Sequence, residues 1–86
     1  VELARSGKLE EAIALFRDAA AGLPANRVIN LNAAQVMLRW LETQGMDEAL
    51  RQETAQYLDR VARIDPESDK YQSIRHRFEA FLAAPS

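Results

Sequence analysis

The chain has 86 residues, a formal net charge of −2 and no cysteine, and 48% of its residues are hydrophobic. This length fits one small domain, and the interspersed acidic and basic residues provide no electrostatic surface for DNA or an anionic membrane. Disulfides and zinc–thiolate sites are excluded, and no apolar run reaches the roughly 18 residues of a transmembrane helix. We therefore expect a cytoplasmic protein without nucleic-acid or membrane partners, and we interpret Val1 as an internal position of a longer chain.

The first part of the chain predicts two helical segments separated by Gly7. Residues 1–6 have the pattern of the last turns of a helix, and Gly7 is placed to be its left-handed C-terminal cap. A second helix is predicted over residues 10–22, with a one-sided apolar stripe. The members of this stripe are Leu9, Ala12, Ile13, Phe16, Ala19, Ala20 and Leu23.

The next predicted helix, residues 27–43, is apolar on two sides, which is typical of a helix buried between neighbours. Asn26 can cap its N-terminus, and Trp40 is expected in the core. The two apolar rows are Val28, Leu31, Leu38 and Leu41, and Ile29, Ala33, Val36, Met37 and Trp40. One polar stripe remains, within about 80° of arc. It consists of Asn32, Gln35, Arg39 and Glu42.

Two further helices complete an all-α prediction. Gly45 ends the preceding helix, Asp47 can cap a helix over residues 48–63, and Asp65-Pro66 forms a turn before a helix over residues 69–83. The expected buried residues of the first are Leu50, Thr54, Tyr57, Leu58, Val61 and Ile64. Those of the second are Tyr71, Ile74, Phe78, Phe81 and Leu82. Because the last helix is apolar on one face only, it suits the end of a stack.

One spacing pattern resembles a known helical repeat. The series Gly7, Ala12, Phe16, Ala19 and Pro24 is similar to the second half of a tetratricopeptide repeat. This resemblance implies antiparallel helix pairs stacked as a short right-handed solenoid in a single domain over residues 1–86. Its parts would be a partial first repeat (1–26), a lengthened second repeat (27–68) and a capping helix (69–86). The second repeat departs from the family because it exceeds the usual length of about 34 residues.

The resemblance also implies a function, because the first helices of these repeats line a groove that binds a partner protein or peptide. The groove face here is the polar stripe of residues 32–42, and Asn32 stands where the family often carries an asparagine that bonds the backbone of a bound peptide. Arg39 can pair with a carboxylate. A basic clamp for a C-terminal carboxylate is rejected, because Val1 and Ile74 occupy two of its positions and only Lys70 matches. The simpler interpretation is that the stripe is only a solvated strip.

A second resemblance gives an alternative function. The phrase from Leu31 to Gln35, within a lengthened helix, is similar to the C-terminal repeat region of some bacterial response regulators. The chain would then be an output or dimerisation domain in two-component signal transduction, with an exposed face of its first helix joining two copies as a homodimer.

We predict no enzymatic activity, no catalytic residue, no metal and no cofactor. His76 lies between Arg75 and Arg77, whose charges disfavour binding of a cation. The acidic pairs Glu10-Glu11 and Asp47-Glu48 occupy first turns of predicted helices, where the helix dipole favours negative charge. Neighbouring residues on a helix point about 100° apart, so neither pair converges on one substrate.

Overall fold

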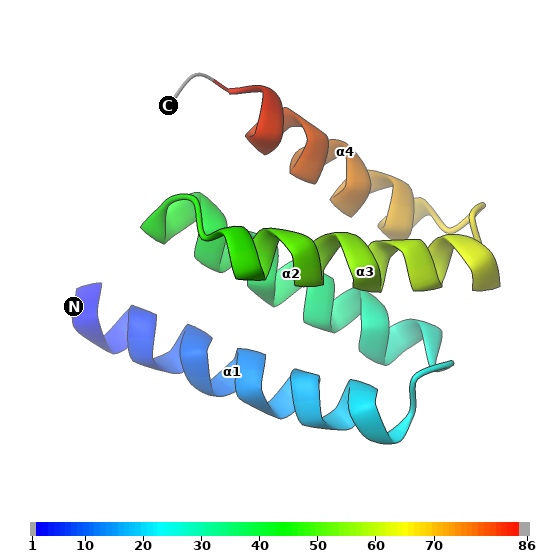
Figure 1. Ribbon diagram of the computed structural model, residues 1–86, viewed down its shortest axis with the longest axis horizontal. Helices are drawn as coiled ribbons and strands as arrows, with labels where there is room; N and C mark the ends of the chain where they lie inside the picture. The colour runs from blue at the N-terminus through cyan, green and yellow to red at the C-terminus, as the bar shows by residue number, and fades with distance from the viewer. Residues whose placement is uncertain (1, 85–86) are drawn as a thin grey trace.

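A computed structural model describes the backbone of residues 2–84 and the side chains of residues 7–84. This part of the chain is all-helical, with α1 (Glu2–Gly22), α2 (Arg27–Gln44), α3 (Glu48–Ile64) and α4 (Asp69–Ala83). The chain reverses direction at each connection, so that α2 and α4 run the same way (Figure 1). None of the described helices is long and apolar enough to cross a lipid bilayer.

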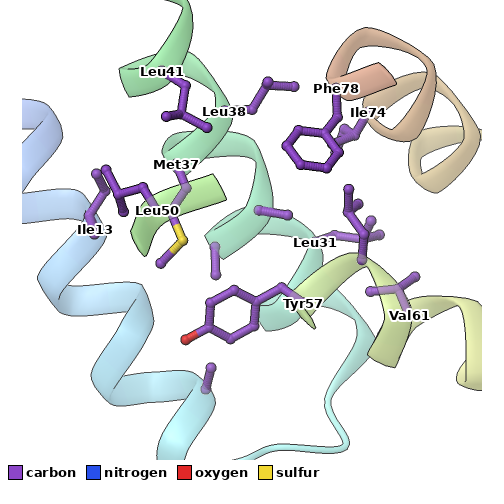
Figure 2. Close-up of a cluster of buried hydrophobic side chains, with 14 residues drawn as sticks. Ile13, Leu31, Met37, Leu38, Leu41, Leu50, Tyr57, Val61, Ile74 and Phe78 are labelled. Atoms are coloured by element: carbon purple, nitrogen blue, oxygen red, sulfur yellow. The ribbon is translucent and has the colours of Figure 1, made fainter. Parts of the chain in front are cut away.

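Helix α2 is the centre of the domain, since it packs against α1, α3 and α4. Its side chains Met37, Leu38 and Leu41 are wholly buried, as a helix surrounded by neighbours requires. Figure 2 shows Ile74 and Phe78 of α4 close to Leu38, with Ile13 of α1 on the other side of the cluster. The expectation that the helix after Asn26 is buried between neighbours, and that the last helix buries one face only, is confirmed.

The predicted helix caps are present. The side-chain oxygen of Asn26 accepts a hydrogen bond from the Ile29 amide at 3.0 Å, and that of Asp47 accepts from the Leu50 amide at 3.1 Å. Each cap satisfies an amide that the first helical turn leaves without a partner. Gly45 follows α2 with a φ of 100°, a conformation that favours glycine, and its amide donates to the Leu41 carbonyl.

The predicted break at Gly7 is wrong. Gly7 lies inside α1, which is continuous from Glu2 to Gly22, and its backbone does not adopt a positive φ. Residues 2–6 therefore belong to the same helix as residues 10–22, whereas residue 1 lies outside the described residues. A glycine inside a helix costs only about 1 kcal/mol relative to alanine, and the strong helix formers that follow it offset that cost.

Several apolar residues expected in the core are exposed. Val28 is 54% exposed and Ile64 is 44% exposed, because both lie within one turn of a helix end, where neighbouring helices diverge into loops. Leu23 and Leu82, near the ends of α1 and α4, are also exposed. Trp40 is half-buried and packs against the core. The position of an apolar residue along its helix thus decides its burial as much as its angular position does.

Candidate functional site

The four residues of the polar stripe lie together on the outer side of α2. Asn32 and Gln35 are half-buried, whereas Arg39 and Glu42 are exposed. At 100° per residue the stripe is opposite the wholly buried Met37, so it is the side of α2 that the core leaves free. These four side chains therefore lie on one surface of α2.

Helix α4 meets the stripe at both of its ends. Lys70 Nζ donates a hydrogen bond to Asn32 Oδ1 at 3.0 Å, and Arg77 forms an ion pair with Glu42. We call the surface formed by Asn32, Gln35, Arg39, Glu42, Lys70 and Arg77 the α2–α4 face. Both bonds are open to solvent, and an exposed ion pair such as Arg77–Glu42 contributes only about 0–1 kcal/mol. The packing of α4 on α2 therefore depends mainly on buried Ile74 and Phe78.

Between these two bonds lie side chains with unused bonding capacity. Neither Gln35 nor Arg39 forms a side-chain hydrogen bond or an ion pair with any other residue that the structure describes. A glutamine amide offers two donors and an acceptor, and a guanidinium offers five donors in a planar fork. This middle section can therefore bond the backbone and a carboxylate of a bound chain.

A separate surface depression of about 300 Å³ lies where α1, α2 and the start of α3 meet. Trp40, Ile13 and Leu50 form its apolar part, and none of the stripe residues lines it. At its rim, Arg17 donates two hydrogen bonds to Glu53, of 2.8 and 2.9 Å, and the bond to Glu53 raises the pKa of Arg17. The depression is open to solvent and its rim charges are partly paired with one another, so we assign no ligand to it.

A buried polar residue that sequence reasoning missed is Asn30. It is wholly buried, and its Nδ2 donates to the carbonyl oxygens of Pro24 at 2.9 Å and Asn26 at 2.8 Å. Its Oδ1 has no partner among the described residues. Asn30 links α2 to the α1–α2 connection, since the Asn26 carbonyl accepts from both its backbone amide and its Nδ2, and the Pro24 carbonyl accepts from Nδ2 as well. The signal in the sequence that could have revealed it is a single amide side chain on the apolar side of α2.

The residues considered for catalysis are dispersed over α1, α3 and α4. Glu10 and Glu11 lie in the middle of α1 rather than in the first turn of a helix. His76 is exposed, and the arginines beside it pair with carboxylates of α2, α3 and α4. Glu48 forms an ion pair with Arg51, whose hydrogen bond lowers the pKa of that carboxyl. Asp47 caps α3, as described above. Within the described residues, no three or more histidine, aspartate or glutamate side chains gather where they could hold a metal ion.

No protein-family model matches the chain, and no curated protein or solved structure is significantly similar to it. The residues that the structure describes form four α-helices, each antiparallel to the one before it in the chain, with α2 at the centre (Figure 1). Any function must be inferred from the surfaces of these helices.

Proposed function

We propose that the chain is a non-enzymatic protein–protein interaction scaffold of the tetratricopeptide type, which binds a segment of a partner protein on the α2–α4 face without a cofactor. The observation that carries this proposal is in the middle of the face. There the side chains of Gln35 and Arg39 can still form hydrogen bonds, whereas the residues at its two ends, Asn32 and Glu42, are bonded to Lys70 and Arg77.

The arrangement of the helices supports the same proposal. Helices α2 and α4 run in the same direction and are bonded side by side, as the first helices of successive repeats would be (Figure 1). In a right-handed solenoid of this type, α1 would be the second helix of one repeat, α2 and α3 would form the next, and α4 would cap the stack. The surface shared by α2 and α4 would then be the binding surface.

Photo-crosslinking tests this proposal directly. A benzoylphenylalanine replaces Gln35 in one variant and Gln56, an exposed residue of α3, in a matched control. We expect irradiation in a native cell lysate to attach one discrete protein to residue 35 and not to residue 56. Equal labelling from both positions, or none from residue 35, would remove the α2–α4 face as the binding surface. Circular dichroism of both variants establishes that they remain folded.

A second candidate is an output or dimerisation domain of a bacterial signalling protein. The observation in its favour is that Leu15 of α1 is 68% exposed beside the half-buried Phe16. Sedimentation of the protein with Leu15→Glu, compared with Ala14→Glu on an exposed neighbouring position, tests it. A dimer that only the first substitution dissociates supports this candidate, and a monomeric wild-type protein rules it out.

A further inference from the structure

Helices α2 and α4 carry a net positive charge. These two helices together carry a formal charge of +2, although the whole chain carries −2, so the remainder carries −4. Their charged side chains are Arg27, Arg39, Lys70, Arg75 and Arg77 against Glu42, Asp69 and Glu79. The α2–α4 face is thus formed by two helices of net positive charge in a chain of net negative charge.

Two of these cations lack a carboxylate partner. The ion pairs of the other three are Arg27–Asp65, Arg75–Asp59, Arg75–Glu79 and Arg77–Glu42. No carboxylate among the described residues pairs with Arg39 or Lys70, and Lys70 donates instead to the neutral amide of Asn32. Both of these charges belong to the α2–α4 face, whose one carboxylate, Glu42, pairs with Arg77 instead.

The positions of these two charges fit an extended chain. Lys70 bonds Asn32, and Arg39 is seven residues further along α2, which corresponds to about 10 Å of helix rise. An extended peptide advances about 3.3 Å per residue, so two carboxylates separated by two to four residues span a comparable distance. Gln35 lies between the two charges and can bond the backbone of the same segment.

We propose that the segment bound on the α2–α4 face is acidic and extended, and that Arg39 and Lys70 pair with two of its carboxylates. This inference rests on the function proposed above and specifies the chemistry of the partner. A nucleic acid fits less well, because two uncompensated cations supply far fewer phosphate contacts than the roughly six to ten of a typical site.

Selection from a display library of random dodecapeptides tests the inference. We expect the selected peptides to be enriched in Asp and Glu. Their affinities, measured by fluorescence anisotropy, should fall about tenfold in the double variant Arg39→Gln with Lys70→Gln. The matched control is Lys8→Gln with Arg63→Gln, which removes the same charge from exposed positions of α1 and α3 and should change the affinity less than twofold. Replacing the acidic residues of a peptide by their amides should cause a similar tenfold loss.

The outcomes separate this inference from the proposed function. The selected peptides could lack acidic residues and yet lose their binding in the double variant Asn32→Ala with Gln35→Ala. This result would overturn the proposal that the bound segment is acidic and support the α2–α4 face as the binding surface. Acidic peptides that bind the double variant and the wild type equally would place their site elsewhere and overturn both. Failure to select any peptide would also overturn both. Tighter binding of a labelled oligouridine than of any peptide would reassign the two cations to phosphate.

Discussion

Substitution of Gly7 by alanine distinguishes a continuous α1 from a turn. An added Cβ at Gly7 meets no atom within 4 Å, and the residue lies in helical backbone. Alanine is favoured over glycine inside a helix by about 1 kcal/mol. We therefore expect Gly7→Ala to raise the free energy of unfolding by about 0.5–1 kcal/mol. In a domain of this size, each 1 kcal/mol corresponds to a melting temperature about 4–8 °C higher.

Gly45 provides the matched control, because space is equally open there and only the backbone differs. Its φ of 100° with a ψ of −178° belongs to a region that is nearly restricted to glycine. Gly45→Ala should therefore lower the free energy of unfolding by about 1–3 kcal/mol. The two glycine-to-alanine changes are expected to have opposite signs in one protein.

Urea unfolding followed by circular dichroism at 222 nm measures both effects. With a slope of about 1–3 kcal/mol per molar urea, the expected gain at Gly7 shifts the midpoint by a few tenths of a molar unit or more. A loss of stability in Gly7→Ala would mean that residue 7 needs a positive φ. It would thereby refute the continuous helix and restore the turn that the tetratricopeptide spacing implies.

Three further predictions concern the core, a cap and a phenol. Leu58→Ala should reduce the free energy of unfolding by about 3 kcal/mol in the same urea assay, since Leu58 is wholly buried; a loss below about 1 kcal/mol would contradict its placement. Asn26→Ala should cost about 1 kcal/mol and Asn26→Ser much less, and equal stability of the two would exclude the cap. Burial raises the pKa of Tyr57 above its ordinary value of 10.0, so in a Tyr71→Phe variant the remaining phenol should titrate above pH 10 by absorbance at 295 nm. Because the folded state holds that proton more tightly, the contribution of Tyr57 to the free energy of unfolding should be fully present below pH 10 and be lost as the pH rises through the raised pKa. A titration midpoint of the phenol at or below pH 10 would contradict this.

Local signals in the sequence predicted the helices well. Asn26 and Asp47 act within three residues of their own positions, so their capping roles follow from the sequence alone. The buried stripe of α3, including Thr54 and Tyr57, also follows from its helical spacing. These features depend on the geometry of one helix and require no knowledge of its neighbours.

Features that depend on tertiary context were harder to predict. At Gly7 two outcomes compete, since the same glycine can cap one helix or be tolerated within a longer one, and the difference of about 1 kcal/mol is decided by flanking residues. The polar stripe was found from its spacing, but its bonds to Lys70 and Arg77 join residues more than thirty positions apart. Asn30 was missed because its Nδ2 donates to carbonyls of a loop rather than to another helix.

The unequal packing of the four helices has a consequence for local opening. Helix α1 packs on α2, and the Arg17–Glu53 ion pair links it to α3, whereas α2 cannot leave without disrupting every other helix. In hydrogen exchange, the amides of α1 should therefore open at a lower free energy than those of α2, whose exchange requires global unfolding. None of the residues of the α2–α4 face belongs to α1. A molecule with α1 detached could thus still hold its partner, and a bound partner would slow exchange in α2 and α4 while leaving α1 free to open.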